Sequence, residues 1–207
     1  MTSVGVRQFL LGIPSIYRFF QGVVGRDKGH LRVAQLLAIQ PGEKVLDIGC
    51  GTADILQHLP DGIDYRGFDT SEAYIAAARA RFGNRGSFSV QTVPLDPSAL
   101  PRQMDVVIAL GVLHHLTDKE AAAMFAAARQ VLRAGGRVLT IDGAYVAGQN
   151  PIARLLLWLD RGRFVRSPEQ YAAIAQRSFS KVGTRVLHDL LRLPYTHCFV
   201  EAIKGQQ

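Results

Sequence analysis

Two glycines at the junction between a strand-like run and a helical segment are the residues of this chain most suited to binding a ligand. Gly49 and Gly51 follow the apolar run Lys44–Ile48 and precede the short helical segment Asp54–His58. Because a glycine has no Cβ, a backbone built on it turns tightly and can approach a ligand closely. The junction therefore predicts a nucleotide-binding loop, in which Cys50 would contribute its backbone alone.

Asp69 supports the same prediction. It ends the next strand-like run, 22 residues after Asp47, and a carboxylate at this spacing is suited to accept hydrogen bonds from both hydroxyls of a ribose. A dinucleotide fingerprint would have a third glycine where this chain has Asp54, which disfavours a pyrophosphate. Asp47, directly before the loop, repels phosphate and attracts an ammonium group. These residues favour a nucleoside that carries a zwitterion.

Two adjacent histidines could act on a second substrate. His114 and His115 follow the apolar run 105–110, and Asp142 and Tyr145 follow the fifth strand-like run. Open α/β sheets bind ligands at this carboxyl edge. We expect one imidazole to face the substrate as a general base or orienting group, while the other packs or binds backbone. Tyr145 is a third catalytic candidate, and Asp142 is either a substrate contact or a turn carboxylate.

Basic and apolar residues coincide between residues 143 and 167. The arginines of this insert are Arg154, Arg161, Arg163 and Arg166. Arginine forks suit carboxylate or phosphate groups, and the leucines of 155–159 can bury apolar ones. We expect the insert to form one wall of a substrate pocket, with Arg154 and Arg161 contacting a hydrophobic, anionic molecule. The alternatives are an interfacial helix on an anionic membrane and a solvated helix face above a buried leucine stripe.

The composition indicates one folded domain. The chain has 207 residues, 48% of them hydrophobic and 20% charged, which excludes a disordered chain. No apolar run approaches the ~20 residues of a membrane span, and the apolar N-terminal run is too interrupted for a secretory signal. The two cysteines have no metal-ligand spacing, so we expect a cytoplasmic protein without a metal. The net charge of +7 leaves nucleic acid, an anionic membrane surface and an acidic ligand open as partners.

Helical and strand-like patterns alternate along the chain. The expected helices cover 7–11, 16–24, 28–39, 54–58, 71–82, 117–132 and 168–179. The expected strands cover 44–48, 64–68, 87–92, 105–110, 137–141, 184–190 and 197–203. This alternation predicts an α/β fold with a doubly wound, mostly parallel sheet and helices on both faces. The last two strands are too close in sequence for a parallel crossover, so we expect them to pair antiparallel.

The motifs VLDIGCGTA, GFDTS, DVVIALGVLHHL and LRAGGRVLTID, together with the closing reversed strand, resemble those of class I S-adenosylmethionine-dependent methyltransferases, in particular the small-molecule group. The resemblance extends from about residue 33 to residue 203. It implies a Rossmann-like sheet of seven strands with the last strand antiparallel. It also implies S-adenosylmethionine as the cofactor and S-adenosylhomocysteine as the product.

The resemblance assigns the cofactor contacts residue by residue. Asp47, Gly49 and Gly51 would line the methionine end, with Cys50 between the glycines. Asp69 would bind the ribose, Thr70 and Ser71 would lie on the adenosine side, and the backbone of Ala109, Leu110 and Gly111 would form the far wall. Family members often have an acidic residue after the third strand that contacts the adenine amine. Here the matching position is Thr92, and Asp96 is the alternative.

The resulting interpretation is one domain over residues 1–207. It has an N-terminal helical lid (1–40) whose Tyr17 contacts the acceptor, a cofactor-binding core (41–142), the basic leucine-rich insert (143–167), and a helix with a closing antiparallel strand pair (168–207). The expected activity is methyl transfer to a small, hydrophobic, anionic acceptor by in-line displacement. A nucleic-acid methyltransferase, an NAD-dependent oxidoreductase and a non-methylating nucleotide-binding protein remain alternatives. The sequence indicates neither the acceptor atom nor an oligomeric state.

Overall fold

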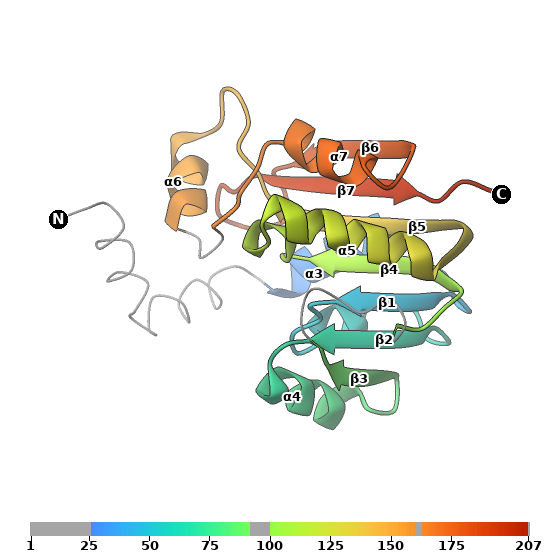
Figure 1. The fold of residues 1–207 in the computed structure, drawn as a ribbon. Helices are drawn as coiled ribbons and strands as arrows, with labels where there is room; N and C mark the ends of the chain where they lie inside the picture. Colours follow the sequence, from blue (N-terminus) through green and yellow to red (C-terminus); the bar gives the residue numbers. More distant parts are fainter. Residues whose placement is uncertain (1–25, 92–99, 160–162, 207) are drawn as a thin grey trace.

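The computed structural model describes residues 26–91, 100–159 and 163–206, and its centre is a seven-stranded sheet (Figure 1). The expected helices 7–11 and 16–24 lie outside these residues. The strands are β1 (Lys44–Ile48), β2 (Asp64–Asp69), β3 (Gly86–Val90), β4 (Met104–Leu110), β5 (Leu132–Gly143), β6 (Lys181–Leu187) and β7 (His197–Ile203). Their order across the sheet is β3-β2-β1-β4-β5-β7-β6.

The strand directions confirm the expected fold class. Strands β1 to β5 pair in parallel, whereas β7 lies between β5 and β6 and is antiparallel to both. The connection 188–196 between β6 and β7 is too short to carry a strand back for parallel pairing. The reversed direction of β7 is visible in Figure 1.

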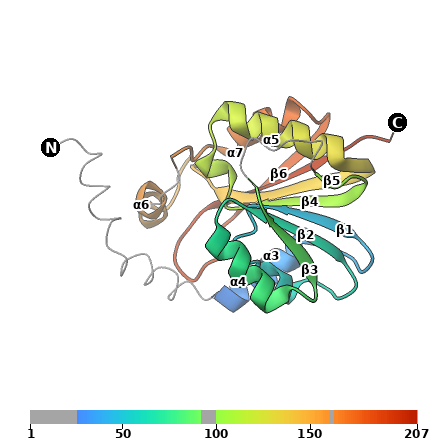
Figure 2. The ribbon, with the colours of Figure 1, turned by 60° about the horizontal axis from the view of Figure 1, so that its bottom comes forward.

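Helices cover both faces of the sheet (Figure 2). The α-helices are α3 (Arg26–Leu37), α4 (Glu72–Phe82), α5 (Asp118–Val131), α6 (Pro151–Leu159) and α7 (Pro168–Gln176), and the 3-10 helices are η1 (Asp54–His58) and η2 (Leu113–His115). Helices α5 and α7 share one hydrophobic cluster with the sheet, and α3, η1 and α4 share the other. In β4, Val107 and Ala109 belong to the first cluster and Val106 and Ile108 to the second, as the two-residue period of a strand requires.

Hydrogen-bonded caps begin the two helices that cover one face. The Thr117 side chain accepts from the backbone N–H of Glu120, whose carboxylate accepts from the Thr117 N–H, so the predicted capping box of α5 is confirmed. Ser167 and Gln170 form the same arrangement at the start of α7. These caps fix where the loops at the carboxyl edge of the sheet end.

Some element boundaries differ from those expected. Helix α5 ends at Val131 instead of continuing into the Gly135-Gly136 stop, because Leu132 is extended, buried and paired with Met104. Strand β5 consequently begins five residues earlier than the run 137–141 indicates. Strand β6 also begins earlier, at Lys181, because pairing with β7 extends over its exposed first residues. In the described part of the chain, no helix has the length and apolar character needed to cross a membrane.

Candidate functional site

The glycine loop lies at the carboxyl end of β1 and is bound to the end of β2. The backbone N–H groups of Gly49 and Cys50 both donate to the carbonyl oxygen of Phe68, at 2.7 and 2.9 Å. Gly49 has φ of 74° and Gly51 has φ of 55°, a backbone region that favours glycine. A Cβ on Gly49 would lie 2.6 Å from Cγ2 of Val112, whereas a Cβ on Gly51 would meet no atom within 4 Å. Gly49 is therefore required by packing, and Gly51 faces open space.

Asp69 joins this loop to the start of α4. Its Oδ2 accepts from the N–H of Gly51 at 2.9 Å, and its Oδ1 accepts from the N–H of Ser71 at 2.8 Å. The Ser71 hydroxyl in turn accepts from the N–H of Tyr74, which caps α4. Each carboxylate oxygen has two lone pairs, so both keep capacity for a further donor such as a ribose hydroxyl. Thr70, between Asp69 and Ser71, is exposed.

Asp47 is buried one residue before the end of β1. The hydroxyl of Tyr65 donates to its Oδ2 at 2.5 Å, while its Oδ1 has no hydrogen-bond partner among the described residues. Burial raises the pKa of Asp47 to about 7; the hydrogen bond from Tyr65 opposes this shift and the charge of Asp69 adds to it. A cationic donor that reached Oδ1 would satisfy the oxygen and stabilise the ionised form. This chemistry fits the ammonium group of an amino acid.

The remaining predicted cofactor residues contribute in different ways. Cys50 is half-buried, burial raises its pKa above the ordinary thiol range, and its Sγ lies 2.8 Å from where a Cβ on Gly67 would be. The Cys50 thiol is thus a packing group. Ala109 is fully buried and Leu110 half-buried at the end of β4, where both pair with β5.

The two histidines differ in burial and in hydrogen bonding. His114 is buried, and Oδ1 of Asp142 accepts from its backbone N–H at 3.1 Å and lies 2.8 Å from its Nδ1. His115 is exposed, with its ring centroid 4.1 Å from that of His114. Asp142 is also buried, and its hydrogen bond from the His114 backbone is of the kind that a capping or turn carboxylate makes. The pairing of His114 with Asp142 joins the loops that follow β4 and β5.

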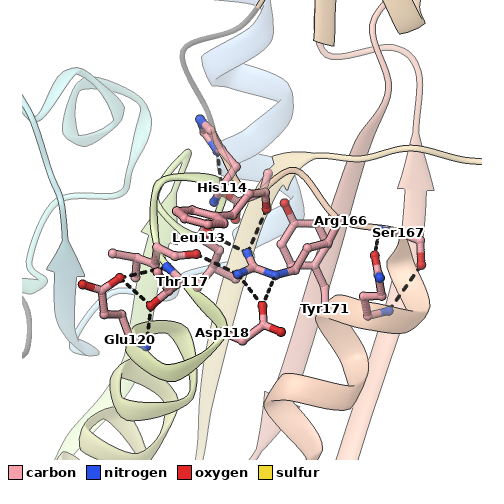
Figure 3. A network of polar contacts seen from close by, with 12 residues as sticks. Leu113, His114, Thr117, Asp118, Glu120, Arg166, Ser167 and Tyr171 are labelled. Atoms are coloured by element: carbon pink, nitrogen blue, oxygen red, sulfur yellow. Dashed lines mark hydrogen bonds and ion pairs between the residues drawn. The ribbon is translucent and has the colours of Figure 1, made fainter. Parts of the chain in front are cut away.

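Arg166 holds the turn that carries the histidines (Figure 3). Its guanidinium donates to the carbonyl oxygens of Leu113 at 2.8 Å and Leu116 at 2.7 Å, and to Oδ1 of Asp118 at 2.7 and 2.9 Å. It also donates to the carbonyl of Phe164. In the sequence Arg166 is one of four arginines of the insert, but in the structure it is only 5% exposed. The sequence feature that could have indicated a fixed position for Arg166 is the capping box of Ser167 and Gln170, which begins at the next residue.

The insert places α6 beyond the carboxyl ends of the parallel strands, as Figures 1 and 2 both show. Ala153 and Leu157 are buried, whereas Ile152, Leu155 and Trp158 are exposed. The Arg154 guanidinium lies 5.3 Å from the centre of the half-buried Tyr145 ring. The exposed side of α6 therefore combines apolar side chains with a cation. Three predicted contacts, Tyr17, Thr92 and Arg161, and the alternative Asp96, lie outside the described residues.

Comparison with known proteins identifies methyltransferases that are similar to this chain. Residues 46–138 match the model of a family described as a methyltransferase domain. An uncharacterized methyltransferase of Geobacillus sp. (strain WCH70) is 27% identical over 138 residues, covering 60% of this chain and 62% of that protein. The ubiquinone biosynthesis O-methyltransferase of Pseudomonas aeruginosa is 33% identical over 101 residues, covering 47% of this chain and 43% of that protein. The alignments thus span less than two thirds of the length of these relatives.

A solved structure extends the likeness of the fold over most of the chain. The TehB-like SAM-dependent methyltransferase from Corynebacterium glutamicum superposes with a TM-score of 0.62 and 19% identity. The superposition covers 92% of this chain and 95% of that one. At this identity, the likeness shows the fold alone.

Proposed function

We propose that this chain, whose residues 46–138 match a methyltransferase-domain model, is a class I methyltransferase that transfers a methyl group from S-adenosylmethionine to a small, hydrophobic acceptor with an anionic group. The proposed cofactor rests on one observation: the two carboxylate oxygens of Asp69 accept hydrogen bonds from the N–H groups of Gly51 and Ser71 at the carboxyl edge of the sheet. A nucleoside bound there lies where open α/β sheets bind ligands.

The residues at this edge fit the parts of the cofactor. Asp69 accepts from the ribose hydroxyls, and the open side of Gly51 lets the backbone approach the ligand. The unpartnered Oδ1 of Asp47 suits the ammonium of the methionine moiety. When bound, the cofactor supplies a sulfonium-activated methyl group. The chain's own contribution is to hold the acceptor in line with the methyl carbon and to exclude water.

Cofactor binding should depend on pH through Asp47. Its pKa of about 7 in the free protein means that half of the side chains are protonated near neutrality. Contact with an ammonium favours the ionised form, so binding lowers this pKa and releases a proton, and affinity weakens as the pH falls below 7. Calorimetry in two buffers of different ionisation enthalpy should detect release of about half a proton at pH 7.

The matched variants are Asp47→Asn and Asp61→Asn, the latter at a carboxylate that is 96% exposed. Asp47→Asn should abolish the proton release, and Asp61→Asn should leave it intact. The pH dependence of the free energy of unfolding tests the pKa of Asp47 independently of the cofactor. Between about pH 4 and 7 the native state of the free protein binds more protons at Asp47 than the unfolded state does, so the free energy of unfolding falls as pH rises through this window. Proton release that survives in Asp47→Asn would contradict the assignment.

The acceptor class rests on α6. Exposed Ile152, Leu155 and Trp158 offer apolar contacts, and the exposed Arg154 offers a charge-assisted hydrogen bond. The acceptor is identified by screening hydrophobic acids, quinone precursors and lipid-linked compounds for release of S-adenosylhomocysteine. For a hydrophobic carboxylic acid, Arg154→Glu should raise KM by about tenfold, and for the corresponding neutral amide by less than about threefold, because only the acid uses the cation.

Arg129→Glu is the control for this prediction. It makes the same change in net charge at an exposed residue in the last turn of α5, away from α6 in sequence. Equal KM values for acid and amide in Arg154→Glu would contradict an anionic acceptor. The competing account is a peripheral membrane contact through α6. Salt-sensitive binding of the parent protein to anionic vesicles, with unaltered solution kinetics in Arg154→Glu, would favour that account instead.

A further inference from the structure

Two buried oxygen atoms of β5 have no hydrogen-bond partner in the described part of the chain. They are Oδ2 of Asp142 and Oγ1 of Thr140. Asp142 is 2% exposed and Thr140 is 0% exposed, so a ligand that approaches from solvent reaches neither atom. An unsatisfied buried polar group lowers the stability of the folded state, and native proteins leave few of them. We therefore expect both oxygens to have a partner inside the protein.

Thr140 and Asp142 face the same hydrophobic cluster. Side chains two residues apart in a strand point to the same side of the sheet, about 6.6 Å from each other. Val138 and Ala144, at the same alternate positions of the chain, both lie in the cluster that α5 and α7 share with the sheet. The two unpartnered oxygens therefore belong to one side of the sheet, beneath α5 and α7.

Two strong donors around Asp142 already have acceptors. The guanidinium of Arg166 has five N–H groups, and they make five hydrogen bonds, to Asp118 and to three backbone carbonyls. The Tyr171 hydroxyl donates to the Gly143 carbonyl at 3.0 Å. Its pKa is raised by burial and by the charge of Asp142, so it keeps its proton. Neither donor is available to Oδ2 of Asp142.

Thr140 has apolar neighbours on both adjacent strands. Its register partners are Ala109 in β4 and Val200 in β7, and neither side chain has a polar atom. The register partner of Asp142 in β7 is Cys198, whose thiol lies 3.8 Å from the carbonyl oxygen of the next residue. Burial and the charge of Asp142 raise the pKa of this thiol to about 12. A neutral thiol is a weak hydrogen-bonding group, so it does not satisfy the carboxylate.

A single water molecule has the size and the chemistry that these two oxygens require. With hydrogen bonds of about 2.8 Å on two sides, a water joins oxygens up to about 5.6 Å apart, which suits side chains at alternate positions of one strand. From this juxtaposition we propose that β5 binds one internal water, which accepts from the Thr140 hydroxyl and donates to Oδ2 of Asp142. Sγ of Cys198 is a weak third partner, and buried waters typically make about three hydrogen bonds.

The water makes Thr140 a positioning residue for the turn after β4. Oδ1 of Asp142 accepts from the backbone N–H of His114 at 3.1 Å. A carboxylate held through one oxygen can still rotate about its broad χ2 torsion, whereas hydrogen bonds to both oxygens fix its plane. Thr140 thus acts on this turn through the water and Asp142. The inference goes beyond the proposed function, because none of these contacts depends on methyl transfer.

The first test is a crystal structure at a resolution that shows ordered water. The expected result is one peak of electron density within about 3.2 Å of both Oγ1 of Thr140 and Oδ2 of Asp142. A site without density in the parent protein, or a direct hydrogen bond between the two side chains, would overturn the proposal.

The second test uses Thr140→Val, which keeps the shape of the side chain and replaces the hydroxyl with a methyl group. Loss of the water-mediated hydrogen bonds should lower Tm by about 2 to 4 °C. If no water binds, the hydroxyl is an unsatisfied buried group, and its removal should leave Tm unchanged or raise it. Thr184→Val is the matched control, because it makes the same substitution at an exposed position of β6 and should change Tm by less than about 1 °C.

The third test separates positioning from a general loss of stability, by amide hydrogen exchange measured with NMR. Thr140→Val should speed the exchange of the His114 N–H, which donates to Asp142, by about three- to tenfold. The His115 N–H in the same turn donates to the Val112 carbonyl at 3.0 Å, and its exchange should change by less than about twofold. Equal acceleration at both amides, or at neither, would overturn the positioning role. Since no cofactor or acceptor is added, failure of the proposed methyl transfer leaves these outcomes unchanged.

Discussion

Gly49→Val should abolish detectable binding of S-adenosylhomocysteine. Two physical effects act together at this position. A β-branched side chain is strongly disfavoured at φ of 74°, and its Cβ would lie 2.6 Å from Cγ2 of Val112. Relief of this collision requires the loop or Val112 to shift, and a shift of the loop disturbs the hydrogen bonds from Gly49 and Cys50 to the Phe68 carbonyl. We expect a loss of affinity of more than about 100-fold, equivalent to about 3 kcal/mol, measured by calorimetry.

Gly42→Val is the matched control for this prediction. Gly42 also has a positive φ, 87°, but a Cβ there meets no atom within 4 Å, and it lies before β1 at the opposite edge of the sheet. Its substitution introduces the backbone strain without the collision at the ligand loop. We expect a lower unfolding temperature with product affinity retained. Normal affinity in a folded Gly49→Val protein would remove the glycine loop from the binding site.

Arg166→Met should cause a large loss of stability. The side chain is 5% exposed and donates to three backbone carbonyls as well as to Asp118. Methionine fills similar volume but leaves the carbonyls without these donors. Since Asp118 itself is exposed, the cost comes mainly from the carbonyls, and we expect about 3 kcal/mol in urea unfolding. That is about 6 to 12 °C in Tm for a domain of this size.

Two further variants separate the geometry of Arg166 from its charge. Arg166→Lys keeps the charge but cannot reach all four partners at once, so it should recover only part of the stability. Arg163→Met removes an exposed arginine three residues earlier and should change the free energy of unfolding by less than about 0.5 kcal/mol. A loss in Arg166→Met no larger than that in Arg163→Met would show that the network in Figure 3 contributes little to the folded state.

Much of the fold could be predicted because its signals are local in sequence. Apolar runs gave the bounds of β1 and β7, Thr117 and Glu120 gave the start of α5, and the short connection before β7 required an antiparallel pair. The glycine loop and Asp69 were likewise predicted from spacing, and the structure brings Asp69 to within hydrogen-bond distance of Gly51. These features depend on the strand, helix and turn preferences of a few neighbouring residues, or on the number of residues between the ends of two successive strands.

The features that sequence analysis could not resolve depend on distant partners. His114 and His115 are equivalent in the sequence, and only the position of Asp142, 28 residues later, makes one of them the buried member of a pair. Arg166 appears as one of four basic residues until the turn at Leu113, 53 residues earlier, is placed against it. The pKa of Asp47 is raised because the side chain is buried, and its burial depends on tertiary packing that the local sequence does not reveal.

The central claim is that the carboxyl edge of β1 and β2 binds the nucleoside of S-adenosylmethionine through Asp69. Calorimetric titration of S-adenosylhomocysteine into the parent protein, Asp69→Ala and Asp64→Ala tests it directly, since Asp64 begins the same strand at the opposite edge. The account predicts one site in the parent, an affinity weakened by about 1.5 to 3 kcal/mol in Asp69→Ala, an unchanged affinity in Asp64→Ala, and no binding of NAD. Equal affinity in parent and folded Asp69→Ala, or binding of NAD in place of S-adenosylhomocysteine, would contradict it.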